Sequence, residues 1–108
     1  MTVDYVVVLC TCSNRAQGRT LADGLVTQRL AACVNMVPGV ESIYTWRGEV
    51  QCDEEVLLVI KTHRRAMAAL TAHLERHHPY DVPEVIALPL EGGSNAYLQW
   101  IDSCVTSE

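Results

Sequence analysis

The sequence predicts an α+β domain in which a four-stranded antiparallel sheet carries two helices on one face, with a further helix at the C-terminal end. Two observations predict this class. Runs rich in Val, Ile and Leu alternate with segments of helical periodicity, in the order β-α-β-β-α-β-α. Gly and Pro residues separate these segments, and no linker or repeat divides the chain. This is the order of the split βαβ, or ferredoxin-like, fold, and residues 1–108 are expected to form one domain.

The first strand and helix follow from local composition. Residues 3–12 are mostly apolar and β-branched and include the run VVVL, which indicates a buried strand. Ser13 or Asn14 can cap the helix that follows. Gly18 and Gly24 should weaken this helix by about 1 kcal/mol each relative to Ala, if they lie in its interior.

The next two strands are expected to form a long hairpin. Residues 31–46 should be extended and bend at Pro38-Gly39, where a bulge is expected. In the turn over residues 46–49, Gly48 supplies the positive φ. The returning strand, residues 50–62, has a polar first half, which should be wet or lie at an interface, and an apolar second half for the centre of the sheet.

The length of this hairpin points beyond a single chain. A strand over residues 50–62 would span about 43 Å at ~3.3 Å per residue. A compact domain of this size has a diameter of roughly 34 Å, so the hairpin should protrude. Because protruding strands leave unpaired edges, we expect a neighbouring subunit to cover them in a closed oligomer.

The remaining elements are a helix, a strand and a last helix. The second helix should run from residue 64 to residue 77 or 78, where Pro79 ends it. A fourth strand is expected over residues 84–90. Ser94 is placed to cap the last helix.

Composition excludes several classes of protein. Hydrophobic residues make up 49% of the 108 residues and charged residues 19%, which predicts a folded core. The net charge of −5 argues against nucleic acid and anionic membranes as partners, and is compatible with cations, metal ions included. The N-terminus does not resemble a signal peptide, so a cytoplasmic location is expected. Five cysteines without a CxxC motif argue against a disulfide framework and a zinc knuckle.

Four long blocks carry a resemblance to a known family. In chain order they are LAACVNMVPGVESIYTWRGEV, EEVLLVIKT, HHPYDVPEVIALPL and GGSNAYLQWI. These blocks resemble the CutA family of divalent-ion tolerance proteins, from about residue 7 to residue 101. The resemblance implies a ferredoxin-like fold assembled into a tight homotrimer, similar to PII signalling proteins. It also implies tolerance of copper and other divalent cations, without established enzyme chemistry.

The stretch HHPYDVPE, residues 77–84, is the first candidate site. Because Pro79 disfavours a helical conformation at the residue before it, His78 should be extended. His78 also continues the apolar stripe of the second helix and should point toward the sheet, with His77 at the stripe's margin. The residues alone favour a helix-ending histidine hydrogen-bonded to the backbone. His73 and His77 have i, i+4 spacing and could form an adventitious metal site, although a solvated helix face is the preferred interpretation.

The resemblance assigns a copper site to Cys10, His77 and His78. A thiolate with two imidazoles suits copper and would also accept zinc. Cys10 and Cys12 lie on the same side of their strand and could chelate one soft ion. The competing interpretation of these two cysteines is one buried thiol and one thiol at the strand end.

A second cluster comprises Trp46, Glu55, Lys61, Tyr80 and Glu84, which the resemblance places near a cleft between subunits. Lys61 ends an apolar strand and Glu84 begins one, so the two could pair across the sheet. One interpretation is a structural ion pair that closes the trimer. The other is a pocket for a small anion or metabolite, as in PII-like proteins.

Three functional hypotheses follow. The leading one is a non-enzymatic homotrimer that binds divalent metal ions, copper among them. The second is a PII-like signalling trimer with a small ligand at the subunit boundary, and the third is a purely structural assembly protein. No nucleophile–base pattern supports an enzyme.

Overall fold

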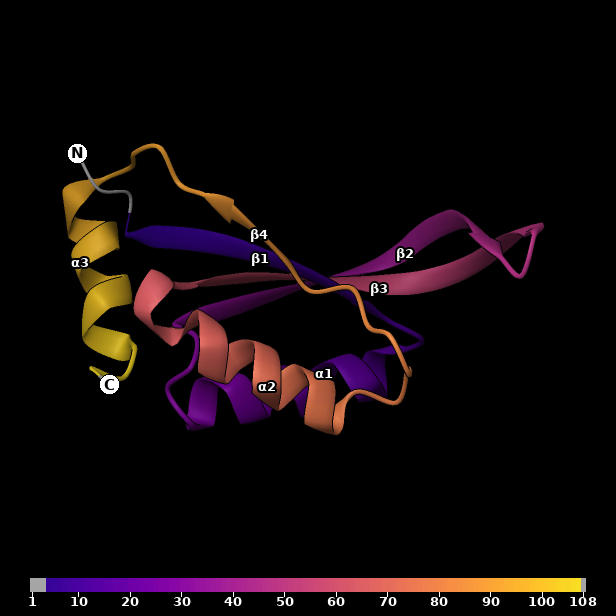
Figure 1. Cartoon of the computed structure of the whole chain (residues 1–108). Helices are drawn as coiled ribbons and strands as arrows, with labels where there is room; N and C mark the ends of the chain where they lie inside the picture. Colours follow the sequence, from indigo (N-terminus) through magenta and orange to yellow (C-terminus); the bar gives the residue numbers. More distant parts are fainter. Residues whose placement is uncertain (1–3, 108) are drawn as a thin grey trace.

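The computed structural model describes residues 4–107 and confirms the expected order of elements (Figure 1). The strands are antiparallel neighbours in the order β2-β3-β1-β4, as in the ferredoxin-like fold. The elements are β1 (Tyr5–Cys12), α1 (Arg15–Thr27), β2 (Cys33–Trp46), β3 (Glu49–His63), a 3₁₀ turn η1 (Arg64–Ala66), α2 (Met67–His77), β4 (Ile86–Pro89) and α3 (Asn95–Cys104).

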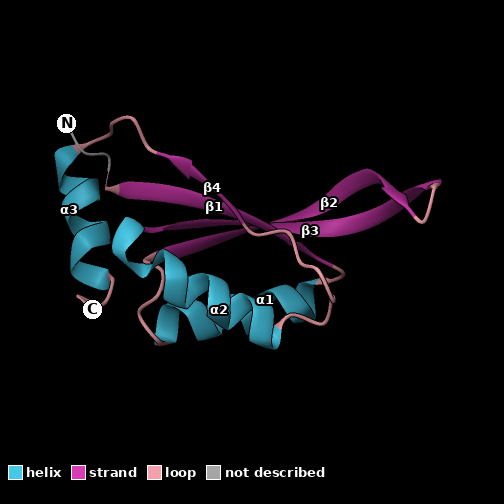
Figure 2. Ribbon diagram, in the orientation of Figure 1, coloured by secondary structure: helices cyan, strands magenta, loops and turns pink. Residues whose placement is uncertain are grey.

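Helices α1 and α2 lie together on one face of the sheet, and α3 lies at the end of the sheet opposite the hairpin (Figure 2). Strand β1 alternates strictly between buried and half-buried residues. Its buried side chains belong to the core cluster that includes apolar residues of β3, α1 and α2. The core therefore sits between the sheet and the two helices.

The other face of the sheet carries apolar side chains without a helix over most of its area. On β1 and β3 the half-buried aliphatic residues of this face are Val7, Leu9, Leu57 and Val59. Their neighbours on β4, Ile86 and Leu88, are 53% and 52% exposed. An apolar sheet face of this kind normally packs against something.

The two glycines of α1 stand where other chain segments come close. A Cβ atom on Gly18 would lie 3.2 Å from both Cys12 Sγ and Met36 Cε. On Gly24 it would lie 2.8 Å from His73 Nε2. The two glycines lower the helix propensity of α1, as expected from the sequence. Their lack of a side chain allows α1 to pack closely on β1, β2 and α2.

The β2–β3 hairpin extends well beyond the rest of the sheet, as expected (Figure 1). The molecule measures 43 × 26 × 22 Å along its principal axes. The register shifts between Val37 and Val40, which confirms the predicted bend at Pro38-Gly39. At the tip, Arg47 and Gly48 have φ values of 52° and 81°, typical of a tight hairpin turn. Strand β3 is one residue longer at each end than expected.

The second half of the chain differs from expectation at three boundaries. Residues 64–66 form a 3₁₀ turn before α2, with His63 Nδ1 accepting a hydrogen bond from the Arg65 backbone N–H. Strand β4 covers Ile86–Pro89 rather than residues 84–90, because it pairs only with the four residues of β1 from Val6 to Leu9. The expected cap is confirmed, since Ser94 accepts a hydrogen bond from the Tyr97 N–H.

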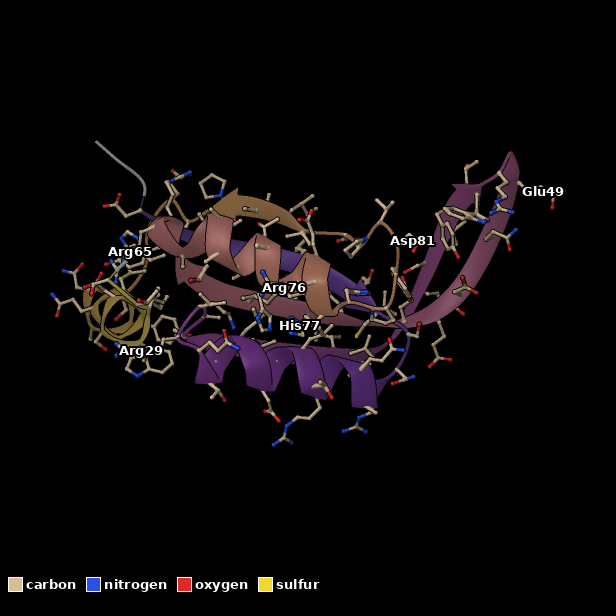
Figure 3. The ribbon with its side chains drawn as sticks, turned by 60° about the horizontal axis from the view of Figure 1, so that its bottom comes forward. Arg29, Glu49, Arg65, Arg76, His77 and Asp81 are labelled. Atoms are coloured by element: carbon tan, nitrogen blue, oxygen red, sulfur yellow. The ribbon has the colours of Figure 1, made fainter. Side chains whose placement is uncertain are left out.

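Two arginine side chains, Arg65 and Arg29, lie beside the C-terminal end of α3 and form hydrogen bonds with it (Figure 3). Arg65 donates to the backbone oxygens of Asp102, Val105 and Thr106, and Arg29 donates to those of Ser103 and Cys104. These donors satisfy carbonyl groups that a helix end leaves without intrahelical partners.

Candidate functional site

His78 connects the end of α2 to β1. Its backbone is extended, with φ −76° and ψ 137°, as Pro79 predicts. The side chain is 7% exposed, and its Nε2 lies 2.8 Å from the Thr11 carbonyl oxygen. Its Nδ1 accepts a hydrogen bond from the Tyr80 N–H at 3.1 Å. The tautomer with its proton on Nε2 satisfies both contacts, so binding a metal would require the ring to give one of them up.

His77 lies on the side of α2 that faces α1 (Figure 3). Its Nδ1 is 2.9 Å from the His73 carbonyl oxygen, and the two imidazole rings stack with centroids 4.2 Å apart. Burial lowers the pKa of His73, and the neighbouring His77 and Arg76 lower it further. His73 is buried rather than exposed, in contrast to the expectation of a solvated pair, because α2 packs closely on Gly24 of α1.

Cys10 is fully buried in the core on the same side of β1 as Cys12. Burial raises the pKa of the Cys10 thiol to about 12, with further contributions from Cys12, Glu84 and Glu55. The thiol is therefore protonated at neutral pH. Burial also raises the pKa of Cys12, whose sulfur lies 3.8 Å from the Val56 carbonyl oxygen.

These side chains do not form a ready metal centre within one chain. Among residues 4–107, no group of three or more His, Cys, Asp or Glu side chains is placed to hold a metal ion. Cys10 faces the core, His78 is hydrogen-bonded at both nitrogens, and His77 lies beside His73.

A groove of about 790 Å³ lies between the hairpin and the loop that joins α2 to β4. Trp46 and Tyr44 of β2, Glu55 of β3 and residues 80–84 contribute to its lining. The groove thus brings together Trp46, Glu55, Tyr80 and Glu84, four of the five residues of the second cluster. Sequence reasoning missed Tyr44, and Asp81 lay in the first candidate stretch, residues 77–84, without a role assigned to it. The alternation of strand residues could have indicated Tyr44, two residues from Trp46.

Lys61 lies apart from this groove. Its ammonium contacts Asn35 Oδ1 and lies 3.9 Å from Cys33 Sγ, on the sheet face opposite α1 and α2. Lys61 and Glu84 do not pair within one chain: the described residues contain no such ion pair. The strand register explains this separation. Lys61 of β3 is paired with Val7 of β1, whereas Ile86, two residues after Glu84, is paired with Leu9 of β1.

A hydrogen-bonded group of three side chains includes two residues that line the groove, Tyr80 and Glu55. The Tyr80 hydroxyl donates to Glu55 Oε2 at 2.6 Å, and its oxygen lies 3.0 Å from Ser13 Oγ. Burial raises the pKa of Tyr80 to about 12, and the hydrogen bond to Glu55 raises it as well. Glu55 is 9% exposed and has no ion pair among residues 4–107. Ser13, considered from sequence only as a possible helix cap, is thus also part of this site, while Asn14 serves as the cap.

No helix within residues 4–107 combines the length and the apolar character needed to span a membrane.

A family model described as CutA1 divalent ion tolerance protein matches residues 6–104. Among curated proteins, the chain is 54% identical to "Protein CutA, chloroplastic" of Arabidopsis thaliana over 100 residues, covering 93% of this chain and 55% of that protein. It is 50% identical to "Divalent-cation tolerance protein CutA" of Thermus thermophilus over 95 residues, covering 88% and 92%. The chain thus spans about half the length of the plant relative.

Solved structures of CutA1 proteins superpose on this chain over nearly its whole length. The crystal structure of CutA1 from Oryza sativa superposes with a TM-score of 0.95 at 48% identity, covering 99% of this chain and 98% of that chain. The divalent cation tolerance protein from Thermus thermophilus has a TM-score of 0.93 at 46% identity, covering 94% and 99%. The chain therefore belongs to the CutA1 divalent ion tolerance protein family.

Proposed function

We propose that this chain forms a homotrimer that binds divalent cations, copper among them, and contributes to tolerance of these ions without catalysing a reaction. The observation that carries the proposal is family membership over residues 6–104, with a Thermus thermophilus relative named as a divalent-cation tolerance protein. The net charge of −5 favours cationic ligands. We place the protein in the cytoplasm, which imaging of a fluorescently tagged full chain would test.

The uncovered sheet face supports the trimer. Val7, Leu9 and Leu88 lie together on this face, and Leu88 is half exposed. The protruding hairpin adds Val50, which is 76% exposed. Burying both surfaces against further copies of the chain in a closed ring would remove them from water.

We propose Cys10, His77 and His78 as the metal ligands. The His78 ring bonds to Thr11, the residue next to Cys10, so the thiol and this imidazole belong to adjoining parts of the fold. Sulfur and imidazole donors suit copper and zinc. Because the pKa of the Cys10 thiol is about 12, a metal must displace its proton, and the apparent affinity should rise with pH.

Titration of the reduced protein with copper and with zinc tests this site. We expect saturable binding that both Cys10→Ser and His78→Ala weaken by about tenfold or more. Cys52→Ser is the matched control, because Cys52 is an exposed cysteine of the hairpin and should not alter binding. Equal affinity in all four proteins would eliminate the Cys10–His78 site, and circular dichroism of each variant would confirm folding.

We propose, as a second function, that the groove binds a small ligand in the manner of a PII-like signalling protein. The observation that favours it is the gathering of Trp46, Glu55, Tyr80 and Glu84 around one groove. Lys61, on the uncovered sheet face, could join this site only from a neighbouring subunit. Ligand binding that survives Cys10→Ser and disappears in Lys61→Ala would support a site shared between subunits.

A further inference from the structure

The charge of the groove restricts the ligands it can accept. Its charged lining residues are Glu55, Asp81 and Glu84, and none of the described residues that line it is Lys or Arg. A groove lined by one sign of charge attracts ligands of the opposite sign. This lining disfavours an anion, in contrast to the anionic ligand considered from the sequence.

Glu55 is the most buried of the three carboxylates that line the groove. It is nine-tenths buried and accepts a hydrogen bond from the Tyr80 hydroxyl, but residues 4–107 provide it with no ion pair. A buried carboxylate without a cation is energetically unfavourable, and a bound cation would offset this cost.

The arrangement of donors favours an organic cation over a metal ion. A bound metal ion needs several ligands that converge on one point, and the described residues contain no such group of three acidic, His or Cys side chains. Aromatic rings of Trp46, Tyr44 and Tyr80 line the same groove. The Arg47 guanidinium lies 5.5 Å from the Trp46 ring centroid, a cation–π contact of the kind that an organic cation would make with the other aromatic rings of the groove.

We propose that this groove binds a small aliphatic ammonium or guanidinium compound, with a cationic group at Glu55 and its methylene chain against the aromatic rings that line the groove. The proposal rests on the ligand-binding function proposed for the groove above. Asp81 and Glu84 also line the groove and suit a second cationic group, so a diamine fits the groove better than a monoamine.

Three probes with the same four-carbon chain test the charge preference: butane-1,4-diamine, butane-1,4-diol and butanedioate. Each would be titrated by isothermal calorimetry into the assembled protein. We expect saturable binding of the diamine alone, with an affinity that falls as salt concentration rises. Tetramethylammonium, which cannot donate a hydrogen bond, should bind more weakly than the diamine.

Two variants locate the site. Glu55→Gln keeps an oxygen that can accept the Tyr80 hydrogen bond and should lower diamine affinity about tenfold or more, because it removes a charge-assisted contact. Trp46→Leu should lower it about threefold by removing the aromatic face. Glu54→Gln is the matched control: it changes the same charge on the same strand at a residue outside the groove lining, and should leave the affinity within about twofold.

The outcomes separate the two proposals. Binding of the diol or the dioate at the groove, with the diamine excluded, would retain a ligand-binding groove and overturn the organic cation. If no probe binds, both the organic cation and the ligand-binding groove are overturned. A groove filled by a neighbouring subunit would give this result. Diamine binding that is equal in wild type, Glu55→Gln and Glu54→Gln would overturn the assignment of Glu55.

Discussion

At the scale of single residues, Tyr80 and His78 hold the groove together. The His78 ring fixes the Tyr80 backbone, while the Tyr80 hydroxyl reaches Glu55 on β3 and Ser13 at the end of β1. These contacts join the loop after α2 to two strands. The groove therefore depends on hydrogen bonds between residues far apart in sequence.

Tyr80→Phe should destabilise the protein in a pH-dependent manner. At neutral pH we expect a loss of about 1 to 2 kcal/mol in the free energy of unfolding, because the hydroxyl bonds are lost. The pKa of Tyr80 is raised to about 12 in the folded state, so the contribution of its neutral form is complete below the ordinary pKa of about 10. It should disappear as pH rises toward 12. Urea unfolding of both proteins at several pH values measures this difference, and one that stays constant up to about pH 11.5 would contradict the account.

Thiol labelling should separate the cysteines by burial. Cys52 is exposed, whereas Cys10 and Cys12 are fully buried with raised pKa values. Since the thiolate is the reactive form, Cys52 should react with iodoacetamide in the native protein and the other two only after unfolding. Peptide mass spectrometry of timed samples would identify the modified sites. Equal native rates for Cys10 and Cys52 would show that Cys10 is accessible.

At the scale of elements, α1 and α2 pack closely because α1 has glycines where its neighbours approach. His73 of α2 sits against Gly24, and its ring also stacks on His77. The interface between the two helices thus depends on one position without a side chain. Helix propensity alone would favour Ala there.

The effect of Gly24→Ala on stability should change sign in a His73→Ala background. In the wild-type background the new Cβ would lie 2.8 Å from His73 Nε2, so we expect destabilisation of about 1 kcal/mol. In a His73→Ala background the contact is absent, and the same change should stabilise the protein by up to about 1 kcal/mol. Thermal unfolding of the four proteins measures the coupling, and the same sign in both backgrounds would refute it.

At the scale of the whole molecule, the distribution of apolar surface distinguishes the two sides of the sheet. One side is buried beneath α1 and α2, and the other is open and apolar. The hairpin extends the open surface beyond the body of the subunit (Figure 1). Such a surface suits assembly rather than an isolated chain.

Leu88→Asp should weaken the proposed trimer. The wild type is expected to have the mass of three 12.0-kDa chains by size-exclusion chromatography with light scattering. A charge at this half-exposed position of β4 should shift the population toward single chains, because the carboxylate would be buried without a partner. Val26→Asp introduces the same charge on α1, at a 44% exposed residue away from that face, and should retain the trimer. A monomeric wild type would exclude the assembly outright.

Local sequence was sufficient for most elements of this fold. Apolar runs predicted the strands, Pro79 the end of α2, Gly48 the hairpin turn and Ser94 the last cap, because each of these depends on residues next to one another. The predicted strand boundaries were wrong where strand pairing sets them. For example, β4 is shorter than predicted because its length depends on its pairing with β1. The candidate site divides in a similar way. Tyr80 and Glu84 could be grouped with Trp46 and Glu55 through the family resemblance, whereas Tyr44 and Ser13 were missed.

By itself, the sequence determined the family, the order of elements and the protruding hairpin, since these depend on motifs, periodicity and length. The tertiary structure alone decided that Lys61 and Glu84 lie apart and that Glu55 is buried beside Tyr80 without an ion pair among residues 4–107. Strand register and burial arise from contacts between distant segments, and no local pattern specifies which side chains then share a groove.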